Sequence, residues 1–402
     1  MYQANENEKL NYKLHRNIGL DYLHTLISNL NMQSSIWVLY LAYMGMNLMQ
    51  IGLLEGIYHA ASIVCEIPSG AMADLLGRRR SMLISRVLLA LSCIIMLFGR
   101  NFGWFALSFI LQSIGNSFNS GSEEALVYDS MKCLGREQEY MKVNGRMNVI
   151  IEVAQALATV AGGILAEYSY FWCYAACTVV ALLALAPILL MTEPPIRGEE
   201  ASKPPLSPAQ TLVQHFRISG AIMKADRRIL NVVAYYSAIF AAQTLMFYYS
   251  QQYFADLGLN KIEISLIMLA VGVVSCAGAL SGSWLFDKMG TKLSRFGAFS
   301  IAVCIACYVL ESLPVAILVF LIANFFNSAL YPVQSDSLNR LVPSKQRATL
   351  LSVNSMFFSL AMILAFPLVG ALADRLGLPV VFAGLGILLM AATGLTVKLR
   401  LE

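Results

Sequence analysis

Charged residues are scarce in this sequence: Asp, Glu, Lys and Arg make up only 13% of its 402 residues. A soluble protein usually carries about twice that share, so the composition argues against a soluble protein. The net charge of only +4 gives no reason to expect a nucleic-acid partner.

Motifs for nucleotide use and for catalysis are absent as well. The sequence has no G-x-x-x-x-G-K-[ST] loop, so we expect no ATP-driven activity. The only histidines in apolar segments, His24 and His59, have no metal-like partner spacing. We therefore expect no enzymatic activity, no cofactor and no metal ion.

Apolar residues, by contrast, dominate the chain. They make up 58% of it, and apolar segments of about 20 residues recur from end to end, each long enough to cross a hydrocarbon core. We predict twelve membrane-spanning helices, at residues 18–44, 49–73, 81–99, 103–127, 141–166, 171–191, 229–253, 263–286, 294–311, 315–337, 348–373 and 379–398. The sequence therefore predicts an all-α membrane protein.

The basic residues predict the orientation in the membrane. If the N-terminus is cytoplasmic, nearly all Lys and Arg outside the helices fall on the cytoplasmic side. Only Arg100, Lys261 and Arg375 fall on the opposite side. This asymmetry predicts that both termini are cytoplasmic.

One long polar segment divides the predicted helices into two sets of six. Residues 192–228 contain five prolines and several basic residues, which is typical of an extended linker. We predict an N-terminal bundle at 1–191, a cytoplasmic linker at 192–228 and a C-terminal bundle at 229–402.

A short pattern recurs at the end of every third predicted helix. A small residue is followed four positions later by an acid, in the pairs Gly70 and Asp74, Gly163 and Glu167, Ser283 and Asp287, and Gly370 and Asp374. Three-helix units repeated four times, with alternate copies inverted, are typical of transporters whose two bundles rock around a central site.

The first copy of this pattern also carries a family signature. Gly70-x-x-x-Asp74-x-x-Gly77-Arg78-Arg79 resembles the loop between helices 2 and 3 of the major facilitator superfamily, although Leu75 replaces the usual basic residue. A weaker copy, with Asp287, Lys288 and Gly290, lies where that family has its second. The resemblance implies two six-helix bundles around a cavity lined mainly by helices 1, 4, 7 and 10.

These residues suggest a gate. We expect Gly70 to allow a neighbouring helix to approach and Gly77 to allow a tight turn. Asp74 is placed to accept hydrogen bonds from the loop or from a helix N-terminus in the other bundle. Arg78 and Arg79 would bind anionic lipid or acids across the seam. The alternative for the arginines is that they only follow the positive-inside bias.

Acids inside predicted helices are candidates for proton coupling, because a charged group in the membrane costs about 2.5–3.5 kcal/mol even on insertion scales. Glu55, His59 and Glu66 lie on one face of helix 2. Glu55 could instead lie close to the outer surface. Asp21 on helix 1 and Glu152 on helix 5 are further candidates.

Polar residues on four helices predict the substrate cavity. These are Gln112, Asn116, Asn119 and Glu123 on helix 4, Tyr235 and Gln243 on helix 7, and Asn324, Asn327, Tyr331 and Gln334 on helix 10. No Lys or Arg lies mid-membrane on these faces, which favours a neutral, zwitterionic or cationic substrate that is partly apolar.

Glu66-x-Pro68 followed by the Asp74 motif resembles helix 2 of bacterial drug/proton antiporters. Small residues at Gly145, Ala154, Ala158, Gly162 and Gly163 on helix 5 are similar to a pattern of exporters, although ordinary helix packing explains them equally well. We predict a monomeric secondary transporter of a bacterial inner membrane, performing proton-coupled efflux of small amphipathic compounds such as drugs. The alternative is proton-coupled uptake of a nutrient or metabolite; a non-transporting receptor fits the buried acids poorly.

Overall fold

The computed structural model describes residues 2–195, 220, 227–341 and 347–395, and these form helices joined by short turns, with no strand among them. Most of the predicted linker lies outside the described residues. The chain divides into two compact units, one made of Met1–Ser34 and Ala61–Leu212, the other of Ser35–Ala60 and Val213–Glu402. The second unit therefore includes a segment that precedes most of the first.

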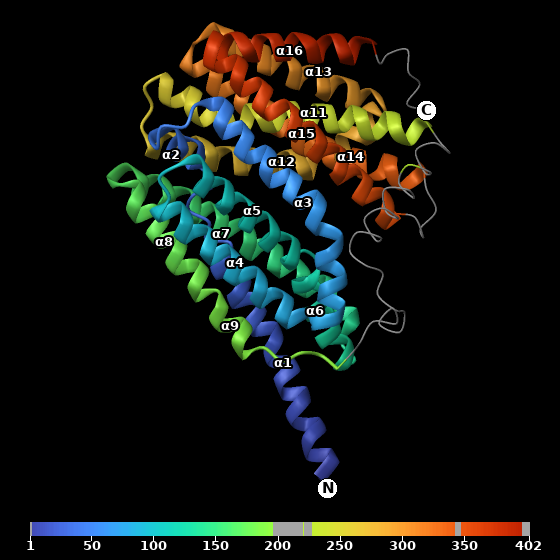
Figure 1. Ribbon diagram of the computed structural model, residues 1–402. Coiled ribbons are helices and arrows are strands. Elements are labelled where there is room, and N and C mark those ends of the chain that lie inside the picture. Colours follow the sequence, from blue (N-terminus) through green and yellow to red (C-terminus); the bar gives the residue numbers. More distant parts are fainter. Residues whose placement is uncertain (1, 196–219, 221–226, 342–346, 396–402) are drawn as a thin grey trace. The chain divides into compact units, whose positions relative to one another are not determined.

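The first unit is drawn in blue to green in Figure 1. Its helices are α1 (Tyr2–Ser28), α4 (Arg78–Phe98), α5 (Phe102–Asn119), α6 (Ser122–Cys133), α7 (Tyr140–Tyr168), α8 (Tyr170–Leu183) and α9 (Leu185–Leu190), with a 3-10 turn η1 (Glu137–Glu139) before α7. Helix α4 packs against α5 and α8, and α1 packs against α6, α7 and α9. Helix α3 (Leu48–Leu76) begins in the second unit and ends in the first.

The second unit contains α2, drawn in blue in Figure 1, and the helices of the C-terminal half, drawn in yellow to red. These are α2 (Trp37–Tyr43), α11 (Arg227–Asp256), α12 (Lys261–Met289), α13 (Lys292–Ala306) with η3 (Cys307–Leu310), α14 (Leu313–Leu341), α15 (Arg347–Leu376) and α16 (Leu378–Leu395). Helix α14 packs against α12 and α13, and α11 packs against α14 and α15.

These helices follow the predicted segments, and the all-α fold is confirmed. Within the described residues, nine helices are long and apolar enough to cross a membrane, which is consistent with a count of twelve. Large apolar side chains point outward from several of them: Leu280 is 85% exposed, Leu364 71% and Leu388 70%. Lipid rather than water is the solvent that such a surface needs.

The predicted helix 1 is divided into α1 and α2, helix 4 into α5 and α6, and helix 6 into α8 and α9 at Ala184. Helix 1 stops at Ser28; near the stop, the carbonyl of Thr25 accepts from the backbone N–H of Asn29 at 3.2 Å and from its side-chain amide at 2.8 Å. Helix 4 is divided into α5 and α6 at Gly121, whose φ of 72° is left-handed and suits glycine.

Glycines allow close helix approach at some positions. A side chain at Gly162 of α7 would collide with the carbonyl oxygen of Met32, in the interruption of helix 1. A side chain at Gly282 of α12 would come within 2.8 Å of the carbonyl oxygen of Ala329 on α14. Around Gly70 no described atom lies within 4 Å of an added side chain, and the residue lies on an exposed part of α3, so the close approach expected there stays a prediction.

Candidate transport site

The first unit encloses a polar cavity of about 410 Å³, at the level where helices 1 and 4 are interrupted. Its wall is rich in side-chain amides, which both donate and accept hydrogen bonds: Asn29, Asn31, Gln33, Gln112, Asn116, Asn119, Asn144, Asn148 and Gln155. No aromatic side chain is among the residues that line it. Interrupted helices whose ends face a cavity are a common way to build a transporter's binding site.

All four residues predicted on helix 4 lie on this wall. Gln112, Asn116 and Asn119 come from α5, and Glu123 lies in the first turn of α6. The break at Gly121 gives α6 a helix N-terminus inside the protein, where the peptide dipoles favour a negative charge. The interruption thus explains why a carboxylate is stable at this depth.

Glu123 is held by three side-chain contacts. Its Oε1 lies 3.0 Å from Nδ1 of His24 and accepts from the hydroxyl of Thr25 at 3.1 Å. Its Oε2 accepts from the amide of Asn119 at 2.9 Å. A carboxylate with these partners is suited to keep its charge.

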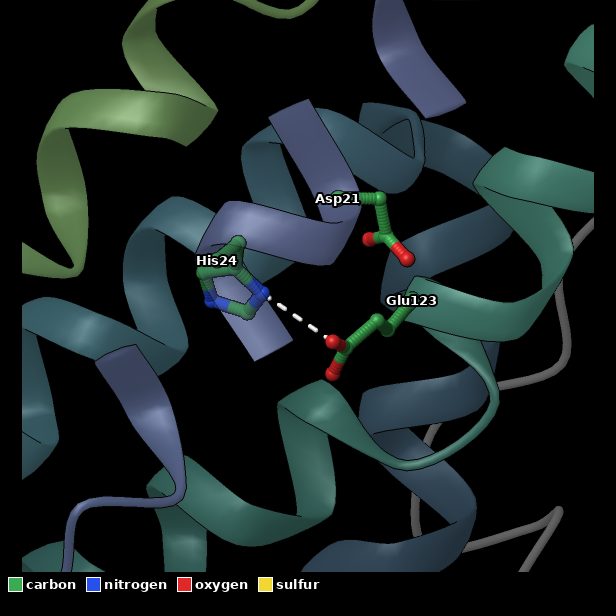
Figure 2. Close-up of side chains that lie close together, drawn as sticks. All are labelled: Asp21, His24 and Glu123. Atoms are coloured by element: carbon green, nitrogen blue, oxygen red, sulfur yellow. Dashed lines mark hydrogen bonds and ion pairs between the residues drawn. The ribbon is translucent and has the colours of Figure 1, made fainter. Parts of the chain in front are cut away.

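Asp21 lies one turn before His24 on α1 and has a different environment. Its side chain is fully buried, and neither carboxylate oxygen has a hydrogen-bond partner among the described residues. Figure 2 shows its carboxylate pointing toward Glu123, while the ring of His24, from the same helix, approaches Glu123 from the left. Glu123, which lines the cavity, therefore has hydrogen-bond partners, whereas the neighbouring Asp21 has none among the described residues.

Arg86 is the residue of this site that the sequence analysis missed. It lies on α4, is only 8% exposed and lines the cavity, where its positive charge acts on Glu123. The sequence analysis looked for mid-membrane Lys and Arg only on predicted helices 1, 4, 7 and 10. Arg86 lies on α4, which is predicted helix 3. The sequence signal was available: a single arginine eight residues into an apolar helix needs a buried partner.

Asp21, His24 and Glu123 also form the cluster best suited to hold a cation. One ligand atom from each lies within 4.8 Å of the others. The donors are mixed: two carboxylates and an imidazole suit transition metals, but His24 and Thr25 already occupy the same oxygen of Glu123. A metal would have to displace these contacts, so the cluster as built fits a proton better than a metal ion.

The predicted acids of helix 2 are divided between the two units. In the second unit, Nε2 of His59 lies 3.6 Å from Glu55, and its Nδ1 lies 3.2 Å from the hydroxyl of Ser359 on α15. Glu55 is buried, at 8% exposed. In the first unit, Glu66 is exposed rather than buried as predicted, although Ser69 and Ala73, three and seven residues further along α3, are buried. Glu152 on α7 is exposed too.

The residues predicted on helices 7 and 10 bond mainly to one another or to other helices of the second unit. Gln243 donates to Asn324 at 2.8 Å, and Gln334 donates to Asn354 on α15 at 2.7 Å. The hydroxyl of Tyr235 bonds the carbonyl of Ser294 on α13. Tyr331 is 67% exposed and stacks on Phe240, while the amide oxygen of Asn327 is buried without a partner among described residues.

The predicted gate residues show a turn held by an unexpected acid. Gly77 precedes α4 with a φ of 96°, a left-handed conformation that suits glycine. Glu193 accepts from the backbone N–H groups of Arg78 at 2.7 Å and Arg79 at 2.8 Å. The guanidinium of Arg79 donates to the carbonyls of Ile188 and Leu189 at the end of α9. The side chain of Asp74 lies outside the described part of the chain.

The second copy of the motif is simpler. Gly290 ends α12 with a φ of 56°, and Lys288 lies 4.0 Å from the ring centre of Trp284. Asp287 is exposed.

The fourth copy of the repeat makes the helix-terminus contact that was predicted for Asp74. Asp374 on α15 accepts from the backbone N–H groups of Leu48 at 2.9 Å and Met49 at 3.0 Å, at the start of α3. The hydroxyl of Tyr249 donates to the carbonyl of Leu48 at 2.9 Å. A side chain at Gly370 would collide with this same carbonyl. The start of α3 is therefore fixed to α11 and α15 within the second unit.

The fold and this polar site define a multi-pass helical membrane transporter. The family model of the Major Facilitator Superfamily matches residues 25–322 and 295–402. The chain belongs to this superfamily of secondary transporters, whose members carry small molecules and are not a class of enzymes.

Known proteins similar to this chain fit the same class. The uncharacterized MFS-type transporter YxaM of Bacillus subtilis (strain 168) is 22% identical over 365 residues, which cover 89% of each chain. The nucleoside transporter NupG has a TM-score of 0.70 at 15% identity, covering 97% of this chain and 99% of the other. A D-xylose–proton symporter has a TM-score of 0.62 at 18% identity, covering 95% and 96%. These structural likenesses show the fold alone.

Proposed function

We propose that this protein transports a small polar solute through the cavity of the first unit and couples that transport to protons at Asp21 and Glu123. The observation that carries the proposal is that two neighbouring acids, with ligand atoms within 4.8 Å of each other, have opposite environments. Glu123 lines the cavity and has hydrogen-bond donors, whereas Asp21 is fully buried without any among the described residues.

The coupling argument follows from the cost of burying charge. An ionised carboxylate without donors in an apolar interior is very unfavourable, so Asp21 holds a proton in this conformation. Glu123, whose ligand atom lies within 4.8 Å of Asp21, adds to this because two neighbouring negative charges repel each other. A change that brings water or a donor to Asp21 would release its proton. Such a change, alternating with solute binding at Glu123, is what coupling requires.

The solute class is argued from the wall. Nine side-chain amides and no aromatic residue suit a solute with many hydroxyl or amide groups better than an amphipathic drug. The named substrates of the similar folds, nucleosides and D-xylose with protons, are of this polar kind. Uptake of a polar metabolite is therefore the candidate that we favour over drug efflux.

Drug/proton antiport, the sequence-based prediction, is the second candidate, supported by the charge of the wall. Glu123 and Glu124 give two negative charges against the one positive charge of Arg86, so the lining has a net charge of −1. This favours a cationic over an anionic solute.

One experiment tests both candidates. The purified protein is reconstituted in proteoliposomes, and proton flux is recorded while a panel of nucleosides, pentoses, short peptides and cationic amphipathic dyes is added. We expect coupled flux with a polar solute. For that solute, Asp21→Asn should abolish uphill transport driven by a proton gradient but retain exchange of solute across the membrane, because the variant mimics the protonated acid.

Glu66→Gln is the matched control, since Glu66 is a membrane-level acid on an exposed face. We expect this variant to keep uphill transport. If Asp21→Asn still pumps with an unaltered pH profile while Glu66→Gln does not, the coupling site is on helix 2 instead. Flux with the dyes alone would favour antiport.

A further inference from the structure

A second pocket, of about 600 Å³, lies in the first unit away from the transport cavity, and the two share no lining residue. It forms where α1, the η1 turn and the first turns of α7 meet. Its lining includes the apolar residues Ile18, Leu20 and Val143. Its polar side carries an excess of positive charge, with the residues His15, Arg16, Arg136, Glu139, Lys142 and Arg146.

The charges of this pocket do not cancel. Arg16, Arg136, Lys142 and Arg146 give four positive charges against the one negative charge of Glu139, so the net charge is 4 − 1 = +3 with His15 neutral. Glu139 is already paired with Arg136, at 2.7 Å between Nη2 and Oε2. Arg16 donates to the carbonyl of Leu190, which fixes one side of its guanidinium.

Two cations of the pocket lack a direct protein contact among the described residues, although the charge of Lys142 acts on Glu139. Lys142 and Arg146 lie one helical turn apart on α7 and are both exposed, and neither makes a hydrogen bond or ion pair within the described chain. Side chains that only follow the positive-inside bias need not converge. Here cations from three segments surround one concavity whose lining includes apolar residues.

We propose that this pocket binds the phosphoryl headgroup of an anionic phospholipid. Lys142 and Arg146 would contact the phosphate, while Arg136 and Arg16, already oriented by Glu139 and Leu190, would complete the site. Basic pockets between membrane helices on the cytoplasmic side suit such headgroups.

The position along the helix favours a lipid over a soluble phosphate. The apolar span that begins at Glu137 includes Lys142 and Arg146 in its first turns, which places the pocket at the level of the headgroups. The lining also includes the apolar residues Ile18 and Leu20, which are only partly buried, and a site for a free anion does not need them. The proposal does not depend on which solute the protein carries.

The test measures lipid binding to the full-length purified protein by native mass spectrometry. Phosphatidylglycerol is compared with phosphatidylcholine, and glycerol 3-phosphate serves as the soluble phosphate. We expect selective retention of phosphatidylglycerol. In the double variant Lys142→Gln/Arg146→Gln, this affinity should fall about tenfold or more, because each cation near the surface contributes substantially to binding anionic lipid.

The control is Lys132→Gln/Lys292→Gln, which removes two exposed cations outside the pocket, and thermal melting checks that both double variants are folded. Equal loss of phosphatidylglycerol in the control and the pocket variant would overturn the proposal, since binding would then follow net charge alone. Competition by glycerol 3-phosphate at equal affinity would also overturn it, in favour of a free phosphate site. Loss confined to the pocket variant supports it.

Discussion

Among the residues that the structure describes, two histidine–glutamate pairs lie inside helical bundles, and their surroundings differ. In the first unit, His24 lies 3.0 Å from Glu123, which lines a cavity and has two further donors. In the second unit, His59 lies 3.6 Å from Glu55, and its ring packs edge-on against Phe358.

The difference separates two roles for similar residues. In the first pair Glu123 lines the cavity, and a second acid, Asp21, lies within 4.8 Å of it, so under the proposed function a change in protonation there would reach the solute. The second pair links α3 to α15 through Ser359, in the same unit where Asp374 holds the start of α3. We interpret the second region as a structural junction of α3 with α15, and the first as the coupling site.

The largest predicted effect is a difference in transport rate between variants of Glu123 and Glu55. Glu123→Gln should reduce proton-driven transport by about 100-fold, because it removes the charge that three donors and Arg86 stabilise. Glu55→Gln should change the rate by less than about threefold. Initial rates in proteoliposomes measure both. Equal losses would erase the distinction between the two pairs.

A stability measurement sharpens the comparison next. Arg86→Met should lower the free energy of unfolding by about 2–3 kcal/mol, because Glu123 then stays buried with less positive charge nearby. The double variant Arg86→Met/Glu123→Gln should recover part of this loss, since the uncompensated charge is gone. Chemical unfolding in detergent gives the values. Additive losses would show that the two residues do not interact.

The junction itself can be weakened at Asp374. Asp374→Asn should cost about 1–2 kcal/mol, because a neutral amide oxygen accepts from the N–H groups of Leu48 and Met49 less strongly than a carboxylate, and its NH₂ group cannot accept. We expect faster hydrogen exchange at the first turn of α3, measured by mass spectrometry. Unchanged exchange there would mean that Tyr249 alone holds this end of the helix.

The smallest effect concerns His59. His59→Gln keeps a hydrogen-bonding group near Ser359 but removes the ring contacts with Tyr58 and Phe358, so we expect a loss of about 0.5–1 kcal/mol. The pH profile of transport should stay the same. A shift in the pH profile would instead indicate that His59 takes part in proton coupling.

The sequence predicted the fold well and the site in part. Apolar periodicity and the repeat defined the helices, and the i, i+4, i+7, i+11 spacing placed Gln112, Asn116, Asn119 and Glu123 on one wall, as the structure shows. Helical spacing describes one helix at a time. It could not show that Arg86, from another helix, turns toward the same wall, nor that Glu66 is exposed.

The repeat pattern predicted that an acid would cap a helix N-terminus. It did not predict at which of the four repeats this contact would be seen. The contact expected at Asp74 is seen at Asp374, four residues after a glycine in the same way. Glu193, which caps α4, came from a segment taken only as linker. Which acid reaches a free helix N-terminus depends on tertiary neighbours, which spacing along one helix does not contain.

Near its N-terminus the chain crosses between the two compact units twice, and the two connecting segments differ in structure. Between Ser34 and Ser35 it crosses through the non-helical stretch that also lines the cavity, whereas between Ala60 and Ala61 it crosses inside the unbroken helix α3. A continuous helix is rigid and transmits a rotation along its length. A non-helical stretch can act as a hinge, because its φ and ψ angles change at low energetic cost. A solute that binds beside Asn31 and Gln33 would therefore contact this hinge directly.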